Sequence, residues 1–194
     1  MAASSIMPKF LPAAKPWRVG GYSHINAAAV AAQAARNAAV PHVAILDIDY
    51  HHGKGTQDIF WERSDVFYAS VHADPATDYP FFWGHADETR RNAGKGKTLN
   101  MPLPRGTSMP AFRATHATAI DAIQGFDPEL LVVSFGADTW EGDPIVHFSL
   151  TTNDYAVLAA DITARGWPAV IVMEGGYATD MLGRNVAAFM AGFA

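Results

Sequence analysis

The chain has 194 residues, with 14 Lys plus Arg against 19 Asp plus Glu, for a net charge of −5. This balance argues against nucleic-acid binding, because no excess of basic side chains exists to hold phosphates. Cysteine is absent, which excludes disulfide frameworks, thiolate zinc sites and iron–sulfur clusters. No run approaches the roughly 18 apolar residues of a membrane span, and prolines interrupt residues 8–16, so we expect a cytoplasmic protein.

The chain divides into a short lead-in and one domain. Residues 1–18 are rich in Ala, Pro and Ser without periodicity, and we expect them to be irregular. The domain at 19–194 alternates helical and extended patterns. Helices are expected at 27–38, 55–62, 109–124, 152–165 and 179–193, and strands at 43–48, 66–71, 98–103, 130–136 and 169–173.

The strands read as nearly continuous apolar runs separated by helices. This pattern is typical of a parallel sheet covered on both faces, which predicts an α/β fold with three layers, helix, sheet and helix. Ligands in such folds bind at the carboxyl ends of the strands. Residues 73–97 combine Pro, Gly and charge without a period, which indicates a long loop of the kind that carries function.

Acidic and histidine side chains gather after these strands. In an extended chain Asp49 and His51 point to the same side, and Asp138 follows another strand. Two carboxylates and an imidazole can hold a divalent cation and leave one coordination position for water. The spacing leaves a second interpretation equally open, in which 47–53 is a solvated strand end whose Asp and His cap the next helix.

Three motifs carry a family resemblance: DIDYHHGKGTQDIF, GADTWEGDP and EGGY, in this order. They resemble the histone deacetylase superfamily, within the arginase/deacetylase fold. The similarity is greatest to bacterial acetylpolyamine amidohydrolases and class II-like deacetylases, supported by YASVHADP, DYPFFWGHADE and GGYSHINAAAVAAQAA. The resemblance covers about residues 19–194.

The resemblance implies a set of functional residues. It makes Asp49, His51 and Asp138 the zinc ligands and Tyr177 the group that stabilises the oxyanion. It implies structural potassium ions as well as zinc. The first monovalent-cation site would include Asp47, Ser70 and Val71, the second Phe60, Arg63 and Val66, and the substrate channel Tyr22, Tyr79 and Gly175.

One departure from the family concerns its catalytic histidine pair. In the family this pair moves protons to and from the water and the leaving amine, but the corresponding stretch KFLPAAKPWRV contains no histidine. We therefore expect a zinc-dependent amidohydrolase for small acetylated amines or acetyl-lysine whose activity is weak, with His24 as a candidate substitute base. The alternative is a non-catalytic truncated pseudoenzyme that keeps its metal sites and acts as a structural or interaction module.

The family's extra N-terminal strands suggest an exposed edge in this chain. In the family those strands lie beside 43–48, so without them we expect this apolar strand to have an unpaired edge. Such an edge predicts a homo-oligomer. We expect no membrane or nucleic-acid partner. Among the remaining candidates, His52 and His72 are expected to support the metal sites. We expect His116 to be a surface or hydrogen-bonded core residue, and Asp143 to set loop geometry.

Overall fold

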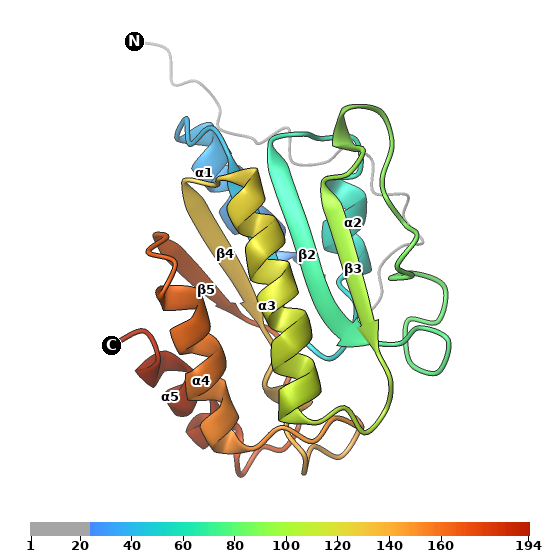
Figure 1. The fold of residues 1–194 in the computed structure, drawn as a ribbon, viewed down its shortest axis with the longest axis vertical. Helices are drawn as coiled ribbons and strands as arrows, with labels where there is room; N and C mark the ends of the chain where they lie inside the picture. Colours follow the sequence, from blue (N-terminus) through green and yellow to red (C-terminus); the bar gives the residue numbers. More distant parts are fainter. Residues whose placement is uncertain (1–23) are drawn as a thin grey trace.

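The computed structural model describes residues 24–194, which form a five-stranded sheet between two layers of helices (Figure 1). All neighbouring strands are parallel, in the order β3-β2-β1-β4-β5. The three-layer α/β fold expected from the sequence is therefore confirmed. The strands are β1 (Val43–Asp47), β2 (Val66–Ala73), β3 (Thr98–Leu103), β4 (Leu130–Phe135) and β5 (Ala169–Met173).

The helices divide between the two faces of the sheet. Alternate side chains of β1 point to opposite faces, so Val43 and Ile45 pack with one helical layer while Ala44 and Leu46 pack with the other. The first layer holds α1 (Ala27–Asn37) and α2 (Lys54–Ile59); the second holds α3 (Met109–Phe126), α4 (Thr152–Thr163) and α5 (Leu182–Ala191).

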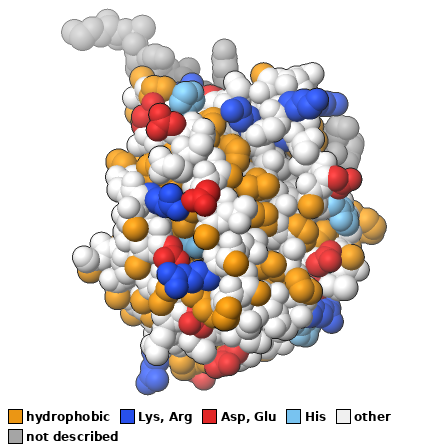
Figure 2. Space-filling view, in the orientation of Figure 1, with side chains coloured by type: hydrophobic (Ala, Val, Ile, Leu, Met, Phe, Trp, Pro, Cys, Tyr) orange, Lys and Arg blue, Asp and Glu red, His pale blue; other side chains and the backbone are white. Residues whose placement is uncertain are grey.

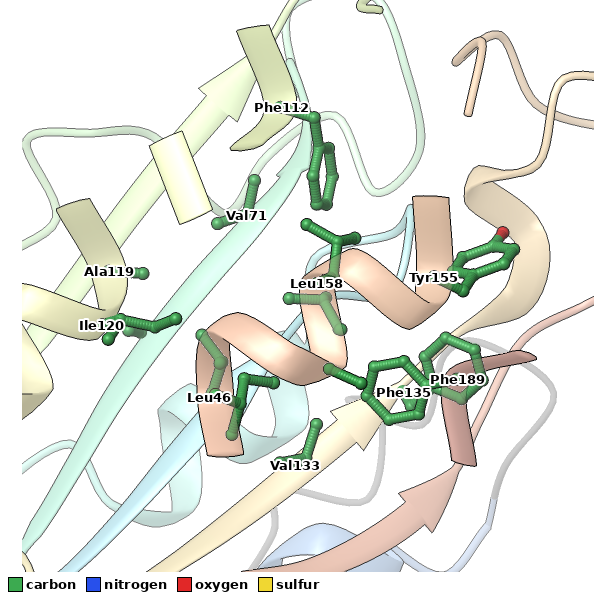
Figure 3. Packing of buried hydrophobic residues seen from close by; sticks show 14 of the residues in the cluster. Leu46, Val71, Phe112, Ala119, Ile120, Val133, Phe135, Tyr155, Leu158 and Phe189 are labelled. Atoms are coloured by element: carbon green, nitrogen blue, oxygen red, sulfur yellow. The ribbon is translucent and has the colours of Figure 1, made fainter. Parts of the chain in front are cut away.

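The larger core lies between the sheet and the second layer (Figure 3). Its best-defined contact is between Phe135 of β4 and Phe189 of α5, whose rings stack with centroids 4.0 Å apart. Leu158 of α4 and Ile120 of α3 are each 1% exposed and complete this layer. The sheet is thus fixed on this face by side chains from all three helices.

The helix boundaries follow local capping. Asn26 caps α1 as expected, because its side-chain oxygen accepts the Ala29 N–H at 2.7 Å. Helix α5 starts at Leu182 rather than at 179. The reason is that the Ala178 N–H donates to the Asp143 carboxylate, and a turn from Met181 N–H to Ala178 O then precedes the helix.

The expectation of an unpaired edge at 43–48 is wrong. Strand β1 is the central strand, paired with β2 on one side and β4 on the other. The cause is topological: α3 carries the chain from the β3 edge back across the sheet, so the fourth strand joins on the far side of β1. The strand order therefore reverses between β1 and β4, which is where ligands bind in open parallel sheets.

The edge that the described residues leave open on this side belongs to β5. Val170 and Met173 are each 41% exposed, whereas every residue of β1 and β2 is buried. A parallel strand normally has both faces covered. Strand β5 is therefore the least protected element of the sheet.

The face shown in Figure 2 mixes acidic, basic and hydrophobic side chains. Helix α3 is joined to the α4 segment by ion pairs, Arg113 with Asp161 at 2.7 Å and Arg165 with Asp121 at 2.6 Å. None of the described helices is long and apolar enough to cross a membrane.

His116 on α3 was expected to be either a surface residue or a hydrogen-bonded core residue, and it is neither. The side chain is fully buried, its ring stacks near that of Phe112, and neither ring nitrogen has a hydrogen-bond partner among the described residues. Burial lowers the pKa of His116 to about 4. The folded chain therefore favours the neutral form of this imidazole, because a charged ring would be buried without a partner.

We predict that His116 makes folding pH-dependent. Because its pKa is lower in the folded chain than in the unfolded chain, stability is full above pH about 6.5 and falls as the pH drops towards about 4. At pH 5 the loss from this group is about 2 kcal/mol. His116→Leu should remove that part of the pH dependence, measured by urea unfolding at pH 5 and 7.5. If the free energy of unfolding of the variant fell between pH 7.5 and pH 5 as much as that of the parent, the buried, neutral state of His116 would be contradicted.

Candidate metal centre

The candidate metal centre lies at the carboxyl ends of β1 and β4, beside the reversal of strand order. Asp49 follows β1, Asp138 follows β4, and His51 completes a group whose ligand atoms all lie within 4.8 Å of one another. His51 Nδ1 is 3.4 Å from Asp49 Oδ1 and 3.1 Å from Asp138 Oδ2. The structure thus brings together the three residues that the spacing and the resemblance singled out.

Backbone amides hold both carboxylates in place. Asp49 accepts the N–H groups of His51 at 2.7 Å and of Gly175 at 2.8 Å, one on each carboxylate oxygen. Asp138 Oδ1 accepts the N–H of Tyr50 at 3.0 Å. These bonds join the segments after β1, β4 and β5, so the orientation of the site is set by the backbone.

Two glycines make room for the carboxylates. A Cβ at Gly175 would lie 2.5 Å from Asp49 Oδ2, and one at Gly136 would lie 2.6 Å from Asp138 Oδ1. Both distances are too short for any side chain. Gly175 was expected in the substrate channel, and the structure adds that its own N–H and its missing side chain shape the metal centre.

The donor set fits zinc. Tetrahedral zinc with bonds of about 2.0–2.1 Å spaces its ligand atoms about 3.3 Å apart, close to the separations from His51 Nδ1 to both carboxylates. Burial opposes a charged His51, but hydrogen bonds to Asp138 and Asp49 outweigh it and raise the pKa of His51 well above its usual range. Burial and the neighbouring Asp49 raise the pKa of Asp138. Asp138 and His51 can exchange the protons that they hold here for a divalent cation.

Two tyrosines flank this cluster. The ring of Tyr177 lies 6.4 Å from that of His51 and the ring of Tyr79 lies 6.1 Å from it, both edge-on. Lys54 lies over Tyr79, with Nζ 5.4 Å from the ring centroid and 3.3 Å from the hydroxyl. Tyr79 is 40% exposed and forms an open rim beside the metal cluster.

The loop that carries Tyr177 is anchored by Asp143. This carboxylate is 6% exposed and accepts the N–H groups of Tyr177 at 2.7 Å and Ala178 at 3.1 Å. The expectation that Asp143 sets loop geometry is confirmed, since Asp143 lies in the loop that follows Asp138. One buried side chain therefore connects the metal-ligand loop to the tyrosine loop.

The residues expected at the first monovalent-cation site also converge. Asp47 and Ser70 face each other in register on β1 and β2, and Val71 is fully buried beside them. Asp47 accepts the Tyr68 hydroxyl at 2.8 Å, and burial raises its pKa well above the usual range. Ser70 also contacts the His72 ring at 2.8 Å.

The other expected site residues are more scattered. His72 lies with its ring 4.7 Å from that of His52, and burial lowers the pKa of His72 to about 3 and of His52 to about 4. His24 is exposed before α1, and Tyr22 lies outside the described residues.

The carbonyls of Phe60 and Val66 both accept hydrogen bonds from Arg90, while Arg63 pairs with Asp65. The sequence reading missed Arg90 because nothing in its long polar loop distinguishes one arginine from another.

This fold and this cluster are typical of the deacetylase class of three-layer α/β proteins. Residues 13–193 match the histone deacetylase domain family, and the chain belongs to it. An acetylpolyamine amidohydrolase from Mycoplana ramosa is 49% identical over 175 residues, covering 90% of this chain and 51% of the relative. A chloroplastic histone deacetylase 14 from Arabidopsis thaliana is 36% identical over 168 residues, covering 84% and 39%.

Solved structures agree with this assignment. The crystal structure of an acetylpolyamine aminohydrolase from Burkholderia pseudomallei matches with a TM-score of 0.88 at 42% identity, covering 90% of this chain and 51% of that chain. The chain thus spans about half the length of these acetylpolyamine amidohydrolases. The predicted arginase/deacetylase fold is confirmed.

We predict that Asp49→Ala abolishes stoichiometric zinc binding. Even a residue that only supports a ligand costs 10–100-fold in metal affinity when removed, so the loss of a ligand should exceed about 100-fold. Zinc titration with a chromophoric competitor measures the affinity. Asp87→Ala, at an exposed loop position, is the matched control and should bind zinc like the parent. Full zinc occupancy in Asp49→Ala would contradict this ligand assignment.

Proposed function

We propose that the chain is a zinc-dependent amidohydrolase that removes acetyl groups from small acetylated amines or acetyl-lysine. The observation that carries this proposal is the convergence of Asp49, His51 and Asp138 beside Tyr177 at the reversal of strand order. The names of the relatives, which include acetylpolyamine amidohydrolases, support a small acetylated amine as substrate.

The chemistry divides among few groups. Zinc, held by the three ligands, supplies a Lewis acid for the acyl carbonyl and an activated water. The Tyr177 hydroxyl donates a hydrogen bond to the oxygen that gains negative charge in the transition state. Asp143 keeps Tyr177 in place through two backbone amides. Tyr79 and Gly175 border the entrance, with Tyr22 as a further proposed wall.

Proton transfer limits the proposed activity. Neither His52 nor His72 suits the role of general base, because each is at most 4% exposed and both have lowered pKa values. A general base typically contributes about 10²–10⁴ in rate, and in this proposal only His24 or solvent takes that role. We therefore propose weak turnover, greatest on activated reporter substrates.

A second candidate function is a non-catalytic module that keeps the metal sites. The burial of His52 and His72 favours it, since neither is accessible as a general base. An acetyl-lysine reporter assay on the zinc-loaded chain separates the two. Turnover that depends on zinc supports the amidohydrolase, whereas stoichiometric zinc without turnover supports the module.

We also propose a structural potassium ion at Asp47. Its carboxylate is 2% exposed and, within the described chain, forms no ion pair with a basic side chain. A buried carboxylate is costly unless it is compensated. Ser70 and the Val71 carbonyl complete an oxygen-rich environment that suits a monovalent cation.

We predict that Tyr177→Phe lowers kcat of any deacetylation by about 10²–10³-fold, the usual cost of removing an oxyanion donor. KM and zinc content should change little, since the ring and the metal ligands remain. Thr118→Val, which removes one exposed hydroxyl on α3, is the matched control and should leave kcat unchanged. Turnover that is insensitive to Tyr177→Phe would overturn the proposed role of the hydroxyl.

We predict self-association through β5. Its two exposed apolar side chains and open edge offer a template for a second copy. Val170→Lys should shift the chain towards monomer in sedimentation velocity at micromolar concentration, because a charge on an edge strand blocks pairing. Ile145→Lys alters an equally exposed loop residue, 47% accessible, and should leave association unchanged. A monomeric parent chain would contradict this prediction.

A further inference from the structure

Arg90 is an arginine buried at the amino-terminal end of the sheet, opposite the metal centre. It lies in the loop before β3 and is 5% exposed. Its φ of 61° is in the left-handed region, which a residue with a side chain adopts at a cost. Both the left-handed backbone and the buried charge cost free energy, so the contacts of the guanidinium must stabilise the folded chain enough to offset that cost.

The guanidinium is held by backbone and hydroxyl oxygens. Nη1 donates to the carbonyl oxygens of Phe60 and Val66, each at 3.0 Å, and Nε donates to the Thr98 hydroxyl. Nη2 has no hydrogen-bond partner, and within residues 24–194 Arg90 makes no ion pair with a carboxylate. Arg90 therefore ties the end of α2 to the starts of β2 and β3.

This environment is unusual for an arginine. A buried arginine is normally paired with an acidic side chain, because an uncompensated charge is costly to bury. Here carbonyl dipoles supply the compensation. Converging backbone carbonyls are how proteins replace the hydration shell of an alkali cation.

The same carbonyls belong to the second monovalent-cation site that the family resemblance implies, at Phe60, Arg63 and Val66. A metal ion bound there would share its oxygens with Arg90 Nη1, and two unit charges so close repel strongly in a buried setting. Arg63 is neutralised by its ion pair with Asp65, so Arg90 is the cation that competes for these oxygens. The residues present thus do not fit a second cation.

We propose that the Arg90 guanidinium replaces the second monovalent cation in this chain. It crosslinks the Phe60, Val66 and Thr98 segments permanently, so the structure at this end of the sheet does not depend on dissolved potassium. The proposal concerns folding and holds whether or not the chain hydrolyses amides.

The test compares the melting temperature of the parent chain with that of Arg90→Gly across potassium chloride concentrations, at ionic strength held constant with N-methylglucamine chloride. Glycine relieves the left-handed backbone and leaves the carbonyls free for a cation. Without potassium, Arg90→Gly should melt at a lower temperature than the parent. At a potassium concentration 100 times the Kd for the ion, its melting temperature should rise by about 5 °C or more. Any response from the Asp47 site is common to both chains and cancels in the comparison.

Two further variants isolate the charge. Arg91→Gly removes the adjacent arginine, whose side chain is 70% exposed and pairs with Glu62, and should respond to potassium like the parent. Arg90→Met fills the space without charge, so potassium should not restore its stability. A potassium response of Arg90→Gly no larger than that of the parent would overturn the proposal.

A measurement on the parent chain covers the case in which Arg90→Gly does not fold. Crystals soaked in rubidium chloride reveal bound monovalent cations by anomalous scattering. We expect no rubidium at the carbonyls of Phe60 and Val66. Rubidium at these oxygens, with Arg90 displaced, would overturn the proposal.

Discussion

The structure depends on two carboxylates that are buried within hydrogen-bonding distance of one imidazole. Asp49 and Asp138 are 8% and 0% exposed, and charges of the same sign at this spacing repel unless something compensates them. The chain compensates in two ways: three backbone N–H groups, from the segments after β1 and β5, point at the carboxylates, and His51 lies between them. Glycines at 136 and 175 are then required, because any side chain would occupy the space that the oxygens need. The site is therefore preorganised for a divalent cation by the fold itself.

Side chains of opposite charge are buried at the two ends of the sheet. At the carboxyl end, buried acids gather around a single imidazole, and among the described residues no Lys or Arg pairs with them, which suits a bound metal ion. At the amino end, Arg90 brings a positive charge among carbonyl oxygens and needs no acid. If the proposal for Arg90 is correct, one end of the sheet relies on cations from solution and the other carries its own. Within one family, a protein side chain and a dissolved ion can then serve the same structural purpose.

Strand β5 forms an open edge of the sheet among the described residues. The chain matches about half of a longer acetylpolyamine aminohydrolase structure with a TM-score of 0.88, and its own described residues hold the candidate metal cluster and the tyrosine loop. Catalysis of the proposed kind needs a proton carrier as well as these groups. The exposed apolar side chains of β5 show where the sheet can accept more structure. Metal binding, proton transfer and sheet completion are thus separable properties, each with its own experiment.

The sequence by itself determined the fold class and the zinc-ligand candidates. Apolar runs and helix caps are local signals, so the five strands and the capping of α1 by Asn26 could be read without a structure. The family motifs supplied Tyr177 and the coverage of the domain. Only the tertiary structure decided the strand order, the burial of His116 without partners, and the contacts of Arg90. These features depend on which segments pack together in space, as where Arg90 contacts Val66 24 residues away, and residue spacing along the chain does not predict such packing. That is why 43–48, which looked like an exposed edge, proved to be the centre of the sheet.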